Sequence, residues 1–135
     1  MITVPWIFRD KGATGPVFVM TSRFEVKSTT NVPRFMILAL RAYLQALRAP
    51  GVVGVSLRAA PLKRSFWTLS SWQDEKQLRA YSVSQPHRGI MRSLGPVTKK
   101  SLFAFYDAPT TPAPTWSDAL ERLAAVEAPE GTPEP

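Results

Sequence analysis

The residue best suited to chemistry in this chain is its single histidine, His87, within the segment SVSQPHRGIMRSLGP. Ser84 is placed to cap a helix whose first turn would hold His87. The positions three, four and seven residues beyond the histidine are occupied by Ile90, Met91 and Leu94. The imidazole therefore shares a face with an apolar stripe, where desolvation and the positive end of the helix dipole both favour its neutral form. A neutral imidazole can act as a general base or as a metal ligand.

Three roles for His87 follow from this placement. The first is a catalytic or substrate-contacting group that moves a proton. The second is an axial ligand of haem, with Arg58 or Arg92 paired to the propionates. The third is a structural side chain that hydrogen-bonds to a backbone carbonyl or to Ser84 and holds the turn. The sequence leaves all three roles open.

Other catalytic and metal-binding arrangements are absent from the sequence. With one histidine and no cysteine, the chain lacks a usual zinc ligand set, so we predict no metal site. It contains neither a G-x-S-x-G nucleophile elbow nor a glycine-rich nucleotide loop. The adjacent carboxylates Asp74 and Glu75 sit at a predicted helix start, where the helix dipole favours them. The remaining candidate is an apolar cavity with few polar groups.

The dispersed distribution of basic residues argues against a nucleic-acid partner. The 135 residues carry a net charge of +7, but the basic residues are dispersed singly or in pairs, without a helix-turn-helix or an aromatic RNA-binding motif. The sequence has no apolar run near the length of about 18 residues that a membrane helix needs, and no signal-peptide pattern. We therefore expect a cytoplasmic protein that binds neither nucleic acid nor a membrane.

The elements that must position these residues follow from apolar periodicity. Strands are predicted at 17–26, 52–60, 65–72 and 99–108, and helices at 31–48 and 74–84. The order βαββαβ predicts a ferredoxin-like α+β fold, with a four-stranded antiparallel sheet and two helices on one face. The sequence divides into an N-terminal arm (1–15), this domain (16–108), a linker with a C-terminal helix (109–127) and a disordered tail (128–135).

A sheet with both helices on one face leaves its other face open. The strand residues expected on the open face are Val17, Val19, Val52, Phe66 and Tyr106. An apolar surface of that extent is typical of an interface, and a two-fold dimer is the commonest solution. We therefore predict a homodimer joined sheet to sheet, with the C-terminal helix docked on the body or on the partner.

Between the sheet and the helices, the sequence predicts an apolar pocket for a hydrophobic small molecule. Its candidate lining residues are Met20, Phe24, Trp67, Trp72, Tyr81, His87, Met91 and Phe103, with Ser22, Ser70, Arg58 and Arg92 as polar neighbours. Small serine positions among large aromatic side chains leave room for a planar ligand held by one or two polar contacts. Ordinary core packing is the alternative for each apolar residue.

Residues 65–96, SFWTLSSWQDEKQLRAYSVSQPHRGIMRSLGP, resemble part of a known superfamily. The features that carry the resemblance are Trp72 at a strand end, Asp74–Glu75 at a helix start, the pair Leu78 and Tyr81, Pro86–His87, and Met91–Arg92. With the later segment PAPTWSDALERL, the chain resembles the antibiotic-biosynthesis-monooxygenase-like dimeric α/β-barrel superfamily, particularly its DUF3291-like and spheroidene-monooxygenase-like branches. The resemblance covers roughly residues 15–125 and implies the dimeric barrel.

The resemblance also implies a small-molecule enzyme of specialised metabolism, monooxygenase-like and without a bound cofactor, acting on a polyketide, terpenoid or aromatic substrate. In this hypothesis His87, Arg92 and Tyr81 supply proton transfer while the pocket confines the substrate. Because the superfamily also contains isomerases and haem proteins, other functions stay open. These are an isomerase or cyclase, a haem protein with His87 as axial ligand, and a non-catalytic ligand-binding dimer.

Overall fold

The structure, a computed structural model, describes residues 1–10 and 14–127, so the predicted tail at 128–135 lies outside the described residues. Its core is a five-stranded sheet in the order β1-β3-β4-β2-β5, in which every neighbouring pair is antiparallel. The strands are β1 (Ile2–Phe8), β2 (Pro16–Val26), β3 (Val52–Ala60), β4 (Ser65–Trp72) and β5 (Thr98–Pro109). The predicted ferredoxin-like α+β fold is confirmed, with one strand more than expected.

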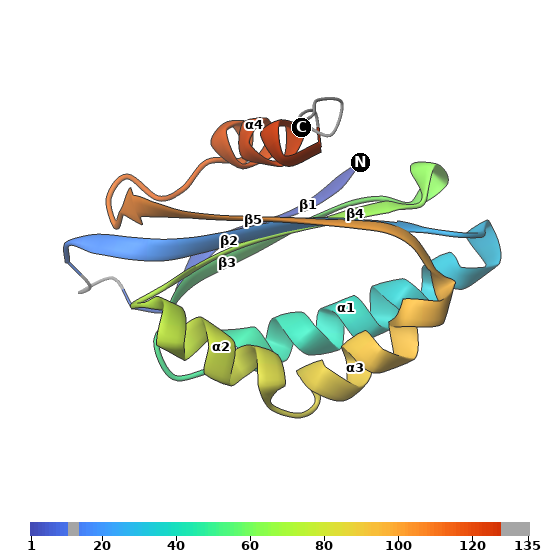
Figure 1. The fold of residues 1–135 in the computed structure, drawn as a ribbon, viewed down its shortest axis with the longest axis horizontal. Helices are drawn as coiled ribbons and strands as arrows, with labels where there is room; N and C mark the ends of the chain where they lie inside the picture. Colours follow the sequence, from blue (N-terminus) through green and yellow to red (C-terminus); the bar gives the residue numbers. More distant parts are fainter. Residues whose placement is uncertain (11–13, 128–135) are drawn as a thin grey trace, which may run out of the picture.

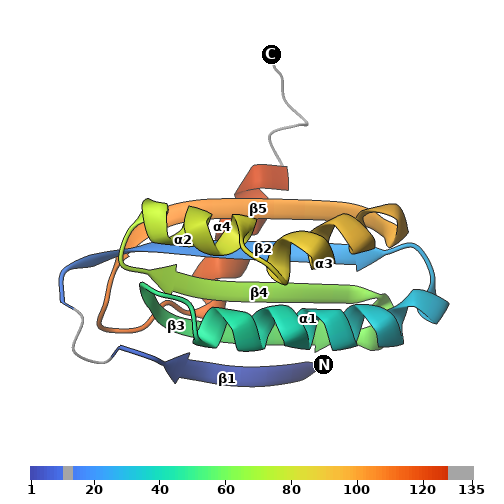
Figure 2. The ribbon, with the colours of Figure 1, turned by 90° about the horizontal axis from the view of Figure 1, so that it is seen from below.

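The helices lie on both sides of this sheet. They are α1 (Val32–Leu47), α2 (Glu75–Val83), α3 (His87–Leu94) and α4 (Trp116–Glu127), with short 3₁₀ turns at Thr29–Asn31, Pro61–Lys63 and Gly95–Val97. Helices α1, α2 and α3 cover one face, and α4 lies across the other (Figure 1). Seen from below, α1 runs over β3 and β4, whereas α2 and α3 lie over β2 and β5 (Figure 2). None of the described helices has both the length and the apolar character needed to cross a membrane.

The strand β1 corrects the prediction of an N-terminal arm at 1–15. It pairs with β3, and its register shifts within the segment that holds Pro5. Proline lacks the N–H that a central strand needs, but it is tolerated at a bulge on an edge strand. Next to it, Trp6 packs so closely on Gly54 that a Cβ there would lie 2.1 Å from the indole ring. Pro5 interrupts the alternation of side chains, which is why the sequence pattern did not indicate a strand.

The sheet face opposite α1, α2 and α3 is partly covered by α4 rather than bare. Val17, Val19 and Tyr106, predicted on this face, are buried in one cluster with Ala119 of α4, and Val53 and Leu69 belong to the same cluster. Val52 and Phe66, predicted on the same face, pack instead on the side of α1, α2 and α3. A register shift directly after Val52 breaks the alternation of side chains along β3, so Val52 lies on the helix-covered face rather than on the face predicted. The prediction for Phe66 is wrong because the alternation of β4 turns its side chain toward α1.

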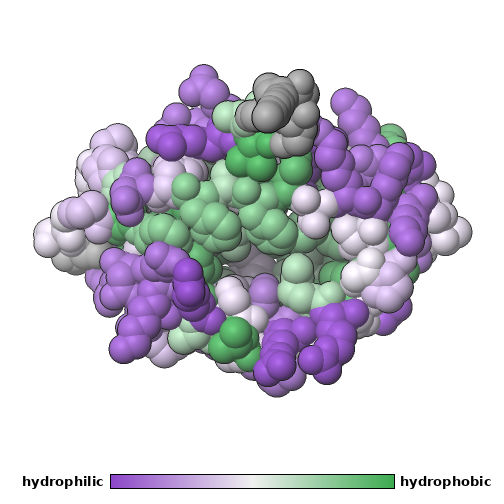
Figure 3. Space-filling model, in the orientation of Figure 1, coloured by the Kyte–Doolittle hydropathy of each residue, from purple (hydrophilic) through white to green (hydrophobic). Residues whose placement is uncertain are grey.

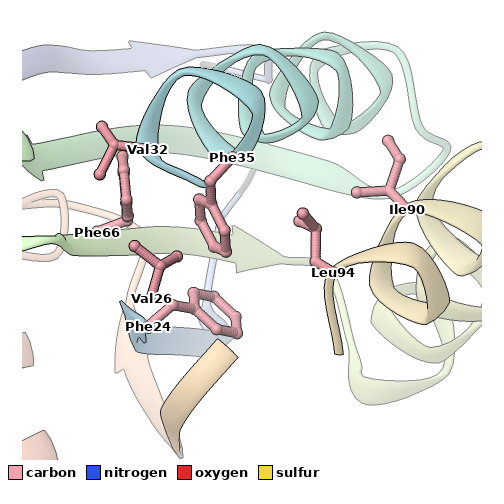
Figure 4. Packing of buried hydrophobic residues seen from close by; sticks show 7 residues of the cluster. All are labelled: Phe24, Val26, Val32, Phe35, Phe66, Ile90 and Leu94. Atoms are coloured by element: carbon pink, nitrogen blue, oxygen red, sulfur yellow. The ribbon is translucent and has the colours of Figure 1, made fainter. Parts of the chain in front are cut away.

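The core beneath the first half of α1 is aromatic. Figure 4 shows Phe24 of β2 and Phe66 of β4 grouped around Phe35 of α1. The rings of Phe35 and Phe66 stack with centroids 4.5 Å apart, and the centroid of Phe24 lies 5.7 Å from that of Phe35. Ile90 and Leu94 of α3 belong to the same buried cluster. This packing anchors α1 and α3 to the sheet.

Candidate active site

A cavity of about 520 Å³ lies between the sheet and the layer of α1, α2 and α3. Phe103 and Phe105 of β5 line it while remaining 39% and 55% exposed, so the cavity opens beside β5. Figure 3 looks onto this side of the molecule, where apolar residues border a hollow between the sheet and the helices. The lining is mainly apolar, and its polar groups include strand hydroxyls and the imidazole of His87. A cavity of this kind suits a hydrophobic ligand.

His87 is the first residue of α3, is half-buried and lines the cavity. Its Nδ1 lies 3.0 Å from the backbone carbonyl oxygen of Ser82. Since a carbonyl oxygen only accepts hydrogen bonds, Nδ1 carries the proton of the neutral ring and Nε2 keeps the lone pair. Burial lowers the pKa of His87, and the hydrogen bond to Ser82 opposes that shift only in part. The imidazole is therefore neutral near pH 7, with Nε2 as its basic atom.

The turn that presents His87 is held from α1 by Gln45. The Oε1 of Gln45 accepts a hydrogen bond from the backbone N–H of His87 at 2.7 Å, and its Nε2 donates to Ser84 Oγ at 2.6 Å. Ser84 Oγ in turn donates to the carbonyl of Tyr81 at 2.8 Å. The prediction that Ser84 caps the helix of His87 is wrong, because Ser84 is the C-cap of α2 and the N-cap position of α3 is held by Pro86. Gln45, 42 residues from His87 in the chain, satisfies that N–H instead.

A series of contacts between tilted aromatic rings connects the sheet to His87. The ring centroids of Trp72 and Tyr81 lie 5.0 Å apart, and those of Tyr81 and His87 lie 4.6 Å apart. The Tyr81 hydroxyl donates to the carbonyl of Ala42 on α1 at 2.9 Å, and burial raises the pKa of this phenol. The phenol is therefore a protonated donor that is engaged with the backbone. Trp72 is fully buried, and its Nε1 donates to Ser70 Oγ at 2.9 Å.

Two hydroxyl groups form a polar spot on the sheet side of the cavity. Ser22 Oγ on β2 and Thr68 Oγ1 on β4 share a short hydrogen bond across the two strands. Thr68 Oγ1 also lies 3.9 Å from the sulfur of Met20, which is a weak acceptor. Ser22 is 1% exposed whereas Thr68 is half-buried, so Thr68 is the more accessible member of the pair.

Most residues predicted to form the pocket do line the cavity. They are Met20, Ser22, Phe24, Ser70, Trp72, Tyr81, His87, Met91 and Phe103. Alternation along β2 and β4 brings the strand residues to one face, and the apolar stripe of α3 adds Met91 beside His87. The cavity therefore lies where the sequence placed it, between the sheet and the helices.

Three residues predicted for the pocket have side chains that lie elsewhere. The guanidinium of Arg58 lies over Trp116 of α4, 4.7 Å from the ring centroid, on the opposite face of the sheet. Trp67 pairs across the sheet with Arg58 and Arg23, and the Arg23 guanidinium lies 5.8 Å from its ring. Arg58 and Trp67 belong to strands that line the cavity. Because side chains alternate along a strand, their own side chains lie on the opposite face of the sheet. Arg92 is exposed and does not line the cavity.

A metal ion or a haem group needs specific ligands from the protein. The residues that the structure describes hold no group of three side chains suited to bind a metal ion. A neutral imidazole whose Nδ1 is bonded to a carbonyl is the arrangement that axial histidines use, so His87 itself is compatible with haem. Arg58 and Arg92 do not fit the predicted pairing with propionates, because one lies over Trp116 and the other is exposed outside the cavity.

Sequence reasoning missed two residues, Thr68 and Gln45. Thr68 alternates with Phe66 and Ser70 along β4, so the phase of the strand already indicated that it faces the helices. Gln45 carried no such signal. Its contacts are with a turn 42 residues further along the chain, and only the packing of α1 against α3 brings the two together.

Comparison with known proteins gives matches to solved structures only, because no family model and no curated protein matches the sequence. SnoaB, a cofactor-independent oxygenase from Streptomyces nogalater, is 19% identical with a TM-score of 0.60, over 74% of this chain and 100% of that one. A candidate antibiotic biosynthesis monooxygenase from Nitrosomonas europaea is 15% identical with a TM-score of 0.63, over 73% and 93%. A conserved protein from Methanosarcina mazei Go1 is 18% identical with a TM-score of 0.60, over 67% and 90%.

Similarity at this level of identity concerns the backbone arrangement and not the reaction. The resemblance carried by the segment around His87 is confirmed for the fold, since structures of antibiotic biosynthesis monooxygenase-like proteins match most of the chain. This chain therefore shares its fold with SnoaB and with the candidate antibiotic biosynthesis monooxygenase from Nitrosomonas europaea.

Proposed function

We propose that the cavity binds a hydrophobic small molecule of specialised metabolism and oxygenates it in a monooxygenase-like reaction without a bound cofactor. The observation that carries the proposal is the neutral His87, which lines a mainly apolar cavity and keeps the lone pair of its imidazole on Nε2. The fold shared with SnoaB, described as cofactor-independent, supports the same reaction class. Aromatic, polyketide-like or terpenoid compounds are the substrates whose size and polarity suit such a cavity.

The reaction requires a substrate with an acidic C–H bond. In the proposed sequence, Nε2 of His87 accepts a proton from a CH₂ group, and the resulting carbanion gives its electrons to O₂. The new C–O bond belongs to a hydroperoxide, which loses water and leaves a ketone. The balance is R₂CH₂ + O₂ → R₂C=O + H₂O, in which the substrate supplies all the electrons and O₂ is the only co-reactant.

The residues around His87 would confine the substrate and exclude water. Tyr81 packs between Trp72 and the imidazole, and these rings form an aromatic wall behind His87. The packing of the apolar wall would hold the C–H bond against Nε2, and such orientation supplies a large part of many rate enhancements. Tyr81 is assigned here to positioning, because its hydroxyl is already bonded to Ala42.

Anthrone is a suitable first substrate, because its CH₂ lies between two aromatic rings and opposite a carbonyl. Chelator-treated protein mixed with anthrone and O₂ should form anthraquinone, with one O₂ consumed per product, faster than the uncatalysed reaction. His87→Gln keeps a polar side chain but removes the base, and it should lower the rate by about 100-fold. Arg88→Gln, at the adjacent exposed position, is the control and should keep the wild-type rate.

Other results would favour the alternative functions. Conversion of the substrate without O₂ uptake would contradict oxygenation and favour an isomerase or cyclase. A Soret band in the purified protein that His87→Gln abolishes would favour a haem protein. Binding without any turnover across a panel of aromatic ketones, phenols and terpenoids would favour a non-catalytic ligand-binding protein.

We also propose that the chain forms a homodimer through the sheet face that carries α4. On this face Arg58, whose guanidinium lies over Trp116 of α4, begins a row that continues with Trp67 and Arg23 across β3, β4 and β2. Asp118 and Glu121 are exposed on α4. A two-fold arrangement would set α4 of each copy against the arginine row of the other, where the charges are complementary.

Gel filtration with light scattering tests this interface. The wild-type protein should have the mass of a dimer. Arg23→Glu and Glu121→Arg should each weaken the dimer by placing like charges together, and the double variant should restore part of it by reversing the pair. Arg92→Glu, exposed on α3, is the control and should remain dimeric. A wild-type monomer at micromolar concentration would contradict the proposal.

A further inference from the structure

We infer that the Ser22–Thr68 hydroxyl pair is the site of the cavity that binds an oxygen atom of the ligand, with Thr68 as the hydrogen-bond donor. The inference rests on the proposed function, because it assigns a polar contact within the same cavity. Both residues line the cavity from neighbouring strands, in a wall that is otherwise largely apolar.

The hydroxyl pair has one O–H more than it uses internally. Two hydroxyls carry two protons, and one of these makes the hydrogen bond between Ser22 Oγ and Thr68 Oγ1. For the second proton, the contact found among the described residues is from Thr68 Oγ1 to the sulfur of Met20 at 3.9 Å. A thioether is a weak acceptor, so a ligand oxygen would replace it with a gain in hydrogen-bond strength.

The surroundings make Thr68 a strong and well-placed donor. When Thr68 donates to a ligand, Ser22 donates to Thr68, and hydrogen bonds in series polarise one another in a buried site. The backbone of Thr68 is held as well, because its carbonyl accepts a hydrogen bond from Thr21 Oγ1 at 2.8 Å. The donor therefore stands on a rigid strand in the middle of the sheet, where its position varies little.

The hydroxyl pair and the imidazole belong to opposite walls of the cavity. Ser22 and Thr68 are carried by β2 and β4 of the sheet, whereas His87 begins α3 in the helix layer. A planar ring that spans these walls would place an oxygen at the sheet and its reactive carbon at His87. When His87 removes the proton, negative charge develops on the conjugated oxygen, and the Thr68 hydroxyl would stabilise it there. A ketone conjugated through a ring to an acidic CH₂ could accept the hydrogen bond from Thr68 and also give its proton to His87.

Anthrone and 9,10-dihydroanthracene form a matched pair of probes, since a carbonyl in one replaces a CH₂ in the other. Their dissociation constants are measured without O₂ by quenching of tryptophan fluorescence, because Trp72 lines the cavity. Thr68→Val should weaken anthrone binding about fivefold, which corresponds to the loss of one hydrogen bond, and should leave dihydroanthracene unchanged. Ser22→Ala should have a smaller effect of the same kind. Thr3→Val, exposed on β1, is the control and should change neither constant.

The outcomes separate this inference from the proposed function. If Thr68→Val and Ser22→Ala, with wild-type circular dichroism, bind anthrone as tightly as wild type does, the hydroxyl pair is not the oxygen site, although oxygenation can still occur. The same holds if both probes are weakened equally. Should Thr68→Val misfold, Thr68→Ser keeps the donor and must retain the preference for anthrone over dihydroanthracene. Failure of both probes to bind the wild-type protein would overturn the proposed function together with this inference.

Turnover gives a second readout. Because the negative charge appears on the oxygen only as the proton leaves, Thr68→Val should lower kcat for anthrone more than it raises KM. A rise in KM with an unchanged kcat would show that the hydroxyl contributes only to binding of the ground state, and it would overturn the catalytic part of the inference.

Discussion

The side-chain oxygen of Gln45 lies 2.7 Å from the backbone nitrogen of His87 and ties the candidate base to α1. The strands β3 and β4 and the helix α2 lie between the two residues along the chain. The same amide holds the turn before α3 through its hydrogen bond to Ser84. Gln45 does not itself line the cavity, so the placement of the imidazole depends on a side chain outside the binding space.

Gln45→Met should therefore lower turnover without removing the base. Methionine is similar in length but leaves the N–H of His87 unpaired, which should also reduce the free energy of unfolding by about 1–3 kcal/mol. We expect kcat for anthrone to fall while KM changes little, with stability followed by urea unfolding. Gln45→Glu retains an acceptor oxygen and should recover part of both quantities. Arg41→Met, on the exposed side of α1, is the control, and an equal loss of kcat in it would contradict this role.

The pH dependence of turnover should report the protonation of His87. Burial lowers the pKa of its imidazole below the usual 6.5, so the basic form already predominates near neutral pH. We expect kcat/KM, which reports ionisation of the free enzyme, to rise with pH through a midpoint below 6.5 and to be constant above about pH 7. Arg88→Gln should leave the profile unchanged. A midpoint above 6.5 would show that another group, or a protonated histidine, governs the reaction.

The same pKa shift should make the folded protein sensitive to acid. Because the pKa of His87 is lower in the folded than in the unfolded state, the unfolded state binds more protons as the pH falls below 6.5. The free energy of unfolding should therefore decrease through this range and stop decreasing on this account below the folded pKa. Urea unfolding at several pH values checks this. His87→Gln should show a smaller loss between neutral and acidic pH, and an identical loss would contradict the shift.

Tyr81→Phe should distinguish a proton-transferring phenol from a supporting one. The substitution keeps the ring contacts with Trp72 and His87 but removes the hydrogen bond to the Ala42 carbonyl. We expect the free energy of unfolding to fall by about 1 kcal/mol, with little change in kcat. A loss of kcat near the 100-fold typical of a missing acid or base would instead assign the phenol to catalysis.

Gly54→Ala should loosen the edge strand β1. A Cβ at this position would lie 2.1 Å from the ring of Trp6, so the indole must move or β1 must shift. We expect a destabilisation of about 1–3 kcal/mol in thermal or urea unfolding. In the double variant with Trp6→Ala the clash is absent, and the effect of the alanine should largely disappear. Additive effects of the two substitutions would show that the ring is not the obstacle.

The parts of the fold that could be predicted are those that depend on the alternation or helical spacing of neighbouring residues. The strand phases of Met20, Ser22 and Phe24 are read directly from alternation, and all three line the cavity. Trp67 is predicted in the pocket, but alternation with Phe66 and Thr68 in the same strand places its side chain on the opposite face. A bulge around Pro5 concealed β1.

Long-range contacts lie beyond what any sequence window contains. The hydrogen bonds of Gln45 join α1 to a turn that follows two further strands and a helix, and local composition holds no trace of them. The cover that α4 provides over Val19 depends in the same way on how the chain returns to the sheet after β5. Both are consequences of tertiary packing.

Consecutive residues of β4 serve different surfaces, since Thr68 faces the cavity and Trp67 faces the side of α4. One residue inserted ahead of this pair, with the strand ends kept in place, would exchange them and present an indole where a hydroxyl now stands. An insertion in β4 therefore changes both faces of the sheet at once, whereas a substitution changes only the face on which that side chain lies. Changes in substrate preference should arise by substitution within the strands, while insertions and deletions are confined to the loops between them.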